Sequence, residues 1–553
     1  MTQPKPSPPS SKSVRQISRG AEVVTYQWNF GDLLDATARL VPPDRPAIIC
    51  GDREILWPEF DRRTNRIARA MIEGGLAPRD RVAILARNVP EYIEIAAACF
   101  KARVSSVNIN YRYTTAEIEY VLRDSGSRQL FYQPEFEPVV APLLQSMPEV
   151  RLICIDKNER YFDMSETGAS NPLGIERSGD DGYLIYTGGT TGYPKGVVWR
   201  AADARTVQLE SPSFKNRPQN MADHEAMILG NTSPHRVMPA CPLMHGAGMN
   251  SSMAELVSGG TVVLLPEGPF RAEVLLDEVE RCAVTRVLIV GDVFARPILQ
   301  ALEANLNRWD TSTLRLMSSA GLMWSREVKR GLVQHIPHIT LIDILGASEA
   351  SGFGYAITTA THETPTGWFE PGPRTVLVDV DTGALLPQEG EVTGLIARDG
   401  PVGSGYHGDP DKTAAIYRVI DGRRYAVPGD IATREKDGRL RLIGRGSQVI
   451  NSGGEKIFTE EVEEALKRAS GITDAIVVGV PDPVWGKAVV ALIRVDADFD
   501  ETSARSAISK DLAAYKLPKV MLVEDEIPRH ASGKSDYRRA LELAQTRLAQ
   551  TPA

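Results

Sequence analysis

A run of glycines, threonines and one lysine between two apolar segments has the residue types of a polyphosphate-binding loop. It spans residues 186–195 and is Tyr-Thr-Gly-Gly-Thr-Thr-Gly-Tyr-Pro-Lys. Glycines let backbone N–H groups approach an anion closely, while hydroxyls and a lysine add donors and positive charge. The residues with these expected roles are Thr187, Gly188, Gly189, Thr190, Thr191, Gly192 and Lys195. Taken by itself, the run also fits a flexible Gly/Thr hairpin.

The loop differs from the phosphate-binding loop of P-loop NTPases. That motif requires Gly-x-x-x-x-Gly-Lys-Ser/Thr followed by a helix. Here Pro194 precedes Lys195, and Gly-Val-Val-Trp follows it, which favours a strand. The pattern therefore argues against a kinase-type or motor-type NTPase.

Seven segments in order resemble the motifs of the adenylate-forming superfamily, which includes acyl-CoA synthetases, peptide-synthetase adenylation domains and beetle luciferases. The resemblance runs from about residue 30 to residue 539 and is far more specific than any single motif. Besides the loop at 186–195, the segments are 242–246, 319–322, 345–349, 428–430 with 444–445, 452–456 and 528–534.

The resemblance implies a role for particular residues in each segment. The implied catalytic residues are Lys195, His245, Glu349 and Lys534, with Glu349 also the ligand of Mg²⁺. The implied nucleotide-binding residues outside the first loop are Ala320, Gly321, Leu345, Gly346, Ala347, Ser348 and the ribose-binding pair Asp430 and Arg445. The implied coenzyme A-binding residues are Gly453, Gly454 and Lys456.

The implied chemistry explains these residue types. A carboxylate is a poor acyl donor, so ATP first converts it to an acyl-adenylate with loss of pyrophosphate, and the thiol of coenzyme A then takes the acyl group. Attack of one anion on another requires charge neutralisation and alignment. A lysine such as Lys534 could bridge the carboxylate and the α-phosphate, and a carboxylate such as Glu349 suits Mg²⁺, a hard cation. Asp430 can accept hydrogen bonds from both ribose hydroxyls.

Each of these residues also has an ordinary structural interpretation. Without its motif, Lys534 would be one more surface lysine. Glu349 and Asp430 could be cap or turn residues, and His245 could be a core histidine. The acidic run at 460–464 follows Thr459 and is expected to be the solvated face of a helix N-terminus, without a catalytic role.

Three positions depart from the common pattern of the superfamily. Gly188 replaces a serine, Leu345 replaces a tyrosine that stacks on adenine, and Ser447 stands at the hinge position that usually holds Asp or Lys. The sequence around these positions is similar to an actinobacterial subgroup whose members activate sterol side-chain acids and other bulky lipid acids.

Alternating strand and helix patterns predict an α/β fold with a mainly parallel sheet. We expect a loose tail (1–28), a large adenylation domain (29–445) that becomes strand-rich after about residue 370, and a small mobile α+β domain (446–553). Residues 204–236 are polar and aperiodic, and are expected to form a long loop. The expected helices are 60–71, 93–100, 273–282, 460–467 and 504–513; the expected strands are 81–85, 261–265, 287–290, 314–317, 475–480, 489–495 and 520–523.

Composition narrows the class of protein. With 42% hydrophobic and 24% charged residues, the chain is typical of a soluble globular protein. A net charge of −8 gives no electrostatic case for a nucleic-acid partner. Five scattered cysteines argue against a disulfide framework or a zinc site and predict a cytoplasmic location. No apolar run is long enough for an integral membrane segment, and the N-terminal tail lacks the apolar stretch of a signal peptide.

Together these features predict an ATP-dependent carboxylic acid–CoA ligase with ATP, Mg²⁺ and coenzyme A as cofactor and co-substrates. The acid is expected to be hydrophobic: medium- to long-chain, sterol side-chain or aryl-alkanoic. The expected walls of the acyl pocket are residues 245–249, 292–294 and 320–323. Transfer of the acyl-adenylate to a carrier protein or another nucleophile, and a non-catalytic AMP- or carboxylate-binding relative, are the alternatives. A homodimer is compatible with these features.

Overall fold

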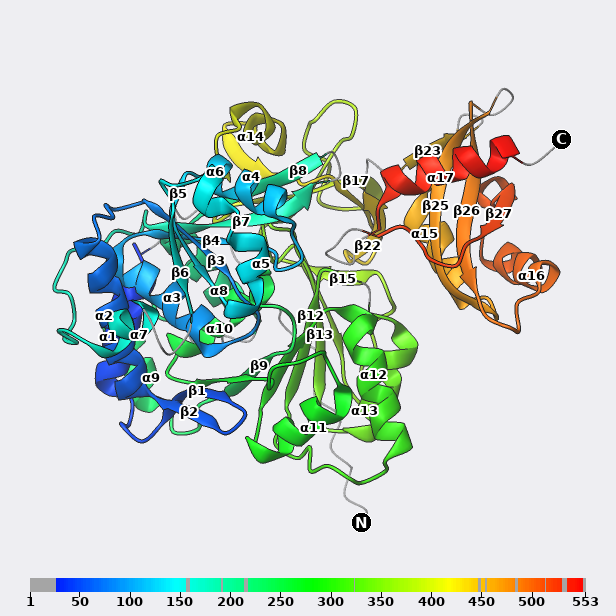
Figure 1. The fold of residues 1–553 in the computed structure, drawn as a ribbon. Coiled ribbons are helices and arrows are strands. Elements are labelled where there is room, and N and C mark those ends of the chain that lie inside the picture. The colour runs from blue at the N-terminus through cyan, green and yellow to red at the C-terminus, as the bar shows by residue number, and fades with distance from the viewer. Residues whose placement is uncertain are drawn as a thin grey trace, which may run out of the picture.

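The structure is a computed structural model. It describes residues 26–155, 160–189, 192–212, 217–322, 324–445, 449–452, 455–482, 486–512, 514–529 and 535–550. The larger part of the chain forms two sheets with helices packed around them, and a smaller C-terminal part forms a separate α/β unit, orange and red in Figure 1. The expected α/β class is therefore confirmed.

The first sheet has seven strands and carries the glycine-rich hairpin at one side. Its central strands are parallel, as expected from the alternating pattern, while β7, β8 and β18 follow one another in antiparallel order. In sheet order the strands are β18 (Gly405–Tyr406), β8 (Gly192–Arg200), β7 (Gly182–Gly189), β4 (Ser105–Asn108), β3 (Arg81–Leu85), β5 (Ser127–Tyr132) and β6 (Arg151–Cys154).

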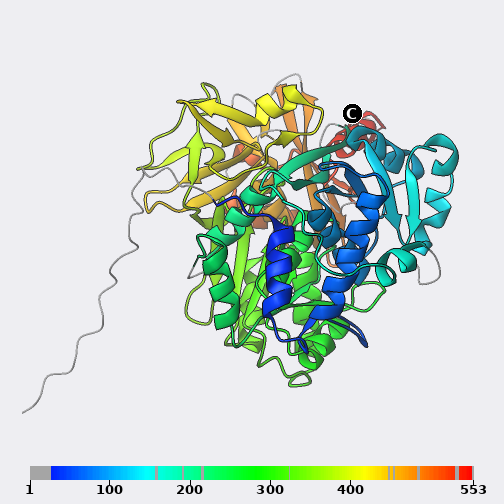
Figure 2. The same cartoon turned by 90° about the vertical axis from the view of Figure 1, so that its left-hand side faces the viewer.

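The second sheet joins a parallel half to the strand-rich part expected after residue 370. In Figure 2 the strand-rich part, in yellow, lies above the green parallel strands. The strand order is β19 (Tyr417–Ile420), β20 (Arg423–Ala426), β17 (Val392–Asp399), β21 (Asp430–Arg434), β22 (Leu440–Arg445), β15 (Trp368–Pro371), β14 (Gly354–Thr358), β13 (Thr340–Leu345), β12 (Leu316–Ala320), β11 (Arg286–Ile289), β9 (Arg236–Pro239), β10 (Thr261–Leu264), β1 (Pro46–Cys50) and β2 (Arg53–Leu56), with β16 (Thr375–Val378) beside β17.

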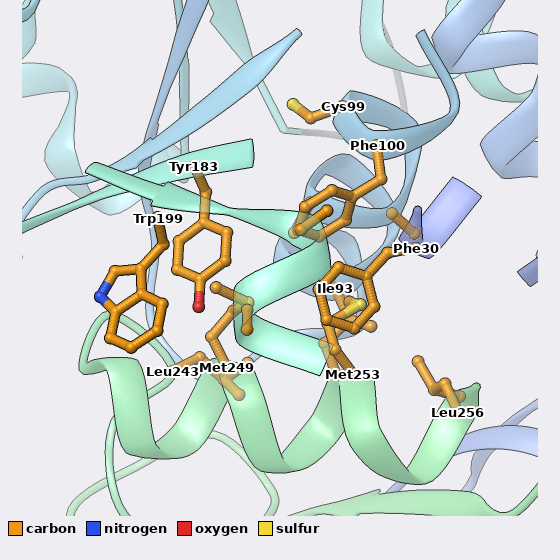
Figure 3. Packing of buried hydrophobic residues seen from close by; sticks show 14 of the residues in the cluster. Phe30, Ile93, Cys99, Phe100, Tyr183, Trp199, Leu243, Met249, Met253 and Leu256 are labelled. Carbon is orange, nitrogen blue, oxygen red and sulfur yellow. The ribbon is translucent and has the colours of Figure 1, made fainter. Parts of the chain in front are cut away.

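Helices cover these sheets and bury the main hydrophobic cores. Figure 3 shows Met249, Met253 and Leu256 on α10 facing Phe30 and Phe100, all members of one buried cluster. The helices of this larger part are α1 (Phe30–Leu40), α2 (Trp57–Glu73), α3 (Pro90–Ala102), α4 (Thr115–Ser125), α5 (Glu137–Val140), α6 (Leu143–Ser146), α7 (Arg160–Glu166), α8 (Ala201–Glu210), α9 (Met221–Gly230), α10 (Gly246–Leu256), α11 (Ala272–Arg281), α12 (Gly291–Ala304), α13 (Arg326–His335) and α14 (Pro410–Ile416), and a 3-10 turn at Pro134–Phe136 precedes α5.

The prediction of a long loop at 204–236 is wrong, because α8 and α9 occupy much of this segment. Their helical pattern is weak in the sequence because polar side chains lie on the buried faces: Arg205 and His224 are both fully buried. Asn220 caps α9 by accepting a hydrogen bond from the backbone N–H of Asp223 at 2.9 Å. Pro212 and Pro218 lie in the connection between the two helices.

The C-terminal part has its own core around a three-stranded sheet. Two buried clusters lie on the two faces of this sheet, one beneath α15 and α16 and one beneath α17. The expected helix at 504–513 begins earlier, at Glu501, because Asp500 accepts from the N–H of Ser503 at 2.8 Å, and Leu512 is extended. The elements are β23 (Val449–Ser452), β24 (Glu455–Phe458), α15 (Thr459–Arg468), β25 (Ile472–Asp482), β26 (Gly486–Val495), α16 (Glu501–Asp511), a 3-10 turn (Ala514–Lys516), β27 (Val520–Val523) and α17 (Tyr537–Gln550).

The start of the chain is packed earlier than the expected tail boundary. Trp28 is only 3% exposed and meets the ring of His224 edge-on, with 6.0 Å between the ring centroids. Asn29 then caps α1, since its side chain accepts from the backbone N–H of Gly31 at 2.7 Å. Trp28, which was expected to belong to the tail, therefore packs with the folded part of the chain.

Candidate active site

One continuous cleft of about 2840 Å³ collects residues from most of the sequence segments that were singled out. It is several times larger than a cavity for one small ligand, so it has room for more than one molecule. The C-terminal part borders it through Glu460, Lys467 and Arg529. Among the expected site residues, those that line the cleft are Thr187, Lys195, His245, Ala320, Gly321, Leu345, Gly346, Ala347, Ser348, Glu349 and Asp430.

Three parallel strands place the central residues of the site at one edge of the second sheet. His245, Gly321 and Glu349 all follow the carboxyl ends of neighbouring or near-neighbouring strands, β9, β12 and β13. Ligands of α/β folds bind at this edge because the loops that leave the strands converge there. Gly321 has φ +90°, a left-handed conformation that side chains other than glycine rarely adopt. The fold thus brings together residues more than a hundred positions apart.

The glycine-rich run is the tip of an antiparallel hairpin. Thr187 on β7 pairs with Lys195 on β8, and Gly189 pairs with Gly192, with an irregularity between the two pairs. The strand expected after Lys195 is confirmed, which agrees with the argument against a P-loop NTPase. The threonines at 190 and 191 lie outside the described residues, so their expected contacts with phosphate stay predictions.

Lys195 is held at the cleft by a residue that the sequence did not point to. Its Nζ lies 3.1 Å from Oδ2 of Asp409, and this hydrogen bond raises the pKa of Lys195. Asp409 is also the N-cap of α14, because its carboxylate accepts from the N–H of Lys412 at 3.0 Å. The hydrogen bond keeps Lys195 protonated and fixes its ammonium group beside the hairpin, where it could also contact a phosphate.

Glu349 lies in a network that fixes both its carboxylate and its backbone. The hydroxyl of Tyr406 donates to Oε1 of Glu349. The hydroxyl of Tyr417 and the N–H of Gly403 donate to the Glu349 carbonyl oxygen at 3.3 and 2.9 Å. Tyr406 stands on β18, which pairs with β8, so the hairpin and Glu349 are positioned by the same strands. No local sequence signal marks Tyr406 for this role.

A second link joins the hairpin to the segment before Glu349. The indole N–H of Trp199 on β8 donates to the carbonyl oxygen of Ser348 at 2.8 Å. Trp199 is 5% exposed, and Figure 3 shows it beside Tyr183, above the start of α10. Trp199 is therefore a packing residue, and its hydrogen bond to Ser348 fixes the position of the segment at 345–349 relative to β8.

The expected ribose pair is brought together by strand register. Asp430 at the start of β21 is the direct partner of Arg445 at the end of β22. Gly429 and Gly444 flank this pair with φ of +102° and +139°. Asp430 lines the cleft, while only the backbone of Arg445 is described.

Several expected site residues lie outside the ranges that the structure describes. Lys534, Gly453 and Gly454 lie outside the described residues, and so do Met323 and Ser447. Lys456 lies in β24, and only its backbone is described. The roles expected for all of these residues stay predictions.

The acyl-pocket residues expected from the sequence only partly match the cleft. His245, Gly246 and Ala247 line it, as do residues 292–294 and 320–322. Met249 does not line it; its side chain lies beside Leu243 in the buried core, as Figure 3 shows. The sequence missed the contribution of α8 and α9, which supply Ala204, Val207, Gln208 and Met227 to the wall.

The acidic run at 460–464 is not uniformly a solvated helix face, and that expectation is wrong for Glu463. This side chain is buried, accepts from the N–H of Val477 at 2.8 Å, and accepts from the hydroxyl of Tyr537 at 3.1 Å. Burial raises the pKa of Glu463 to about 7. Glu463 therefore joins α15, β25 and α17 within the C-terminal part.

Replacing this buried acid should change how stability depends on pH. Because the folded-state pKa of Glu463 is raised, its proton stabilises the fold below about pH 4.5, and this stabilisation is lost as the pH rises through about 7. Glu463→Gln keeps a neutral acceptor, so its stability relative to the wild type should rise by roughly 1–3 kcal/mol between pH 5 and pH 8. Chemical unfolding monitored on the C-terminal part measures this difference. A pH-independent difference would contradict the buried, protonated carboxyl, and Glu501→Gln on exposed α16 is the matched control.

Comparison with known proteins decides the family. The sequence profile of the AMP-binding enzyme family matches residues 34–407, and the profile of the AMP-binding enzyme C-terminal domain matches residues 461–534. The chain belongs to the AMP-binding enzyme family. Within this family it is 35% identical over 541 residues to the medium/long-chain-fatty-acid–CoA/3-oxocholest-4-en-26-oate–CoA ligase of Mycobacterium tuberculosis, covering 94% of this chain and 97% of the relative.

A second ligase and one solved structure are also similar to this chain. The 3-oxocholest-4-en-26-oate–CoA ligase of Rhodococcus rhodochrous is 35% identical over 549 residues, covering 94% and 97% of the two chains. The crystal structure of ATP-bound MatB from Rhodopseudomonas palustris has the same fold: the TM-score is 0.78 at 22% identity, covering 94% of this chain and 99% of MatB. The family places a large N-terminal α/β domain before a small C-terminal domain, as this chain does.

Two features concern the described part of the chain as a whole. In the described part of the chain, no helix combines the length and apolar character needed to cross a bilayer. Within those same residues, no three His, Cys, Asp or Glu side chains form a cluster that could hold a metal ion by themselves.

Proposed function

We propose that this chain is an ATP-dependent carboxylic acid–CoA ligase that makes an acyl-adenylate and then an acyl-CoA thioester. The observation that carries the proposal is the single cleft bordered by Lys195, Glu349 and Asp430, from three distant segments. Lys195 would meet the triphosphate, Asp430 would meet the ribose hydroxyls, and Glu349 would meet the Mg²⁺ that accompanies the phosphates. Family membership and the named activities of the two ligases support the same reaction.

In the first half-reaction, a carboxylate oxygen of the acid attacks the α-phosphorus of ATP, and pyrophosphate leaves. Lys195 would hold the departing β- and γ-phosphates by charge, and Asp430 would accept from the ribose hydroxyls. Glu349 would hold Mg²⁺, which when bound neutralises phosphate charge. Lys534 would align the carboxylate with the α-phosphate, and His245 would border the carboxylate pocket.

In the second half-reaction, the sulfur of coenzyme A attacks the acyl carbonyl carbon, and AMP leaves with the oxygen that joined them. We propose that Gly453 and Gly454 let the pantetheine arm pass close to the backbone and that Lys456 assists binding. We also propose that residues 446–553 act as the mobile unit that changes position between the two steps, with its boundary near Ser447. Arg529 already borders the cleft from this unit.

A hydrophobic acid is the proposed substrate. Apart from Gln208, the wall behind His245 is largely apolar, with Ala204, Val207 and Met227 from α8 and α9. The two relatives are named as ligases of medium- and long-chain fatty acids and of a sterol side-chain acid. We propose the same substrate classes here, together with aryl-alkanoic acids.

A cytoplasmic location and a homodimer stay predictions. Light scattering of the purified protein tests whether it is a homodimer.

Lys195 offers a direct test of the nucleotide part of the proposal. Lys195→Ala removes the charge beside the hairpin, and the KM for ATP should rise about tenfold to a hundredfold, since a charged hydrogen bond contributes about 1.5–3 kcal/mol. Lys436→Ala, in the exposed turn between β21 and β22, is the matched control and should leave the KM unchanged. An unchanged KM in the Lys195 variant would contradict its assignment to the phosphates.

CoA-dependent release of AMP, measured over a panel of fatty, sterol-derived and aryl-alkanoic acids, tests the proposed function as a whole. The proposal predicts AMP and acyl-CoA in equal amounts with at least one hydrophobic acid. AMP formed without consumption of coenzyme A would favour transfer to a carrier protein or another nucleophile. No AMP with any acid would favour a non-catalytic binding protein.

A further inference from the structure

The cleft extends well past the catalytic edge of the second sheet. Three neighbouring strands line it. On β12 the lining residues alternate, at Leu316, Ser318 and Ala320, because side chains of a strand point to opposite faces. On β11 the lining residues are Arg286, Val287 and Leu288, and on β13 they run from Ile342 to Leu345. Met317 on the opposite face of β12 is packed in the core beneath α11, α12 and α13. The cleft therefore follows β12 along its whole length, from Ala320 back to Leu316.

Helix α10 forms the other wall of this channel. Its cleft-facing residues recur every three to four positions, at Ala247, Asn250 and Ala254, and continue to Glu255 and Ser258. The opposite side of α10 packs into the core shown in Figure 3. From His245 to Glu255 the helix rises by about 15 Å, and β12 from Ala320 back to Leu316 spans about 13 Å. The floor of the channel thus lies roughly 13–15 Å from the carboxylate pocket.

The floor of the channel is polar, although its walls are mostly apolar. Arg286 stands at the amino end of β11, Glu255 near the end of α10, and His235 just before β9. Asn231 and Ser258 complete the group. Glu255 is only 5% exposed, and Gly260 leaves room for it: a Cβ at Gly260 would lie 1.8 Å from Oε1 of Glu255.

Arg286 and Glu255 lack the direct hydrogen bonds that a structural ion pair would have. Arg286 and Glu255 attract each other, but neither side chain makes a hydrogen bond, or an ion pair within 4.0 Å, with any residue in the described ranges. Burial raises the pKa of Glu255 to about 7 and lowers that of Arg286. When a ligand fills the cleft, leaving a polar group without a partner is unfavourable, and more so when the group is charged.

An apolar chain end would leave these groups unpaired, whereas an oxygen would satisfy them. A carbonyl or hydroxyl oxygen accepts from the guanidinium of Arg286, and a hydroxyl also donates to the carboxylate of Glu255. Resting on the proposed function, we propose that the substrate is a long hydrophobic acid with a keto or hydroxyl group at its far end, and that Arg286 and Glu255 bind this group. Arg286 and Glu255 are then specificity-determining residues, distant from the reacting atoms.

The test compares two acids that differ only at the far end, 12-hydroxydodecanoate and dodecanoate, by CoA-dependent AMP release. The wild type should favour the hydroxy acid in kcat/KM by about tenfold or more, because a site with unpaired polar groups rejects an analogue that lacks the oxygen. Arg286→Leu should remove this preference, because kcat/KM should fall for the hydroxy acid and rise for dodecanoate, whose apolar end would then meet a leucine. Glu255→Gln should reduce the preference in the same way but by less.

Arg315→Leu is the matched control, since Arg315 is exposed at the same end of the sheet and does not line the cleft. It should retain the wild-type preference, and the thermal unfolding of all three variants checks their folding. If the wild type turns over both acids equally well, the inference is overturned while the proposed function stands. AMP release with neither these acids nor any other would overturn the proposed function and, with it, the inference.

Discussion

Lys534→Ala is expected to lower the rate of acyl-adenylate formation by about 10²–10³-fold, the usual effect of removing one group that stabilises charge in a transition state. The same variant should form acyl-CoA from a chemically prepared acyl-adenylate at close to the wild-type rate. The reason is that the lysine is proposed to align two anions, and this repulsion is present only in the first half-reaction. Single-turnover measurements of each half-reaction provide the two rates.

The control for this variant is another lysine of the C-terminal part. Lys487 is exposed on β26, and Lys487→Ala should leave both half-reactions unchanged. Equal loss of both half-reactions in Lys534→Ala would contradict its proposed role and would indicate instead that the substitution disturbs the C-terminal part as a whole.

Glu349→Gln is expected to lower adenylate formation by a similar factor, about 10²–10³-fold, and to raise the concentration of Mg²⁺ needed for half-maximal rate. Glu349 is the charged residue of the segment at 345–349, and Gln keeps the shape of its side chain without the charge. Tyr406→Phe removes only the hydroxyl that donates to Glu349. Its effect should be smaller, about tenfold, because it misplaces the carboxylate without neutralising it.

A titration of rate against Mg²⁺ distinguishes these roles. Glu391→Gln, an exposed acid just before β17, is the control and should titrate as the wild type does. If Glu349→Gln keeps the wild-type Mg²⁺ dependence and loses rate, Glu349 contributes to the fold of the site and does not hold the ion.

The resemblance to the adenylate-forming superfamily singled out residues that the fold brings to one cleft. Lys195, Glu349 and Asp430 come from three distant segments, and in the structure all three border that cleft, while their roles stay predictions. The strand after Lys195 is set by local residue types, so a single sequence contains that signal. The direct pairing of Asp430 with Arg445 depends on strand register, which no local pattern indicated.

The sequence predicted less where the position of a residue depends on distant elements. Tyr406 and Asp409 reach Glu349 and Lys195 only because β18 pairs with β8. Arg286 on β11 and Glu255 on α10 border the same cleft, and nothing in either segment alone indicates a common cavity. Helix α8 was missed for a related reason, since its buried Arg205 weakens the apolar period that marks a surface helix.

The central claim is that an acyl-adenylate forms in this cleft, and the fate of the carboxylate oxygen tests it most directly. An accepted acid is labelled with ¹⁸O in both carboxylate oxygens and turned over with ATP and coenzyme A. The account predicts that the AMP released carries one ¹⁸O, because the carboxylate oxygen that attacked the α-phosphorus leaves with AMP. Label in inorganic phosphate, with unlabelled nucleotide, would show activation at the γ-phosphate and would contradict the account.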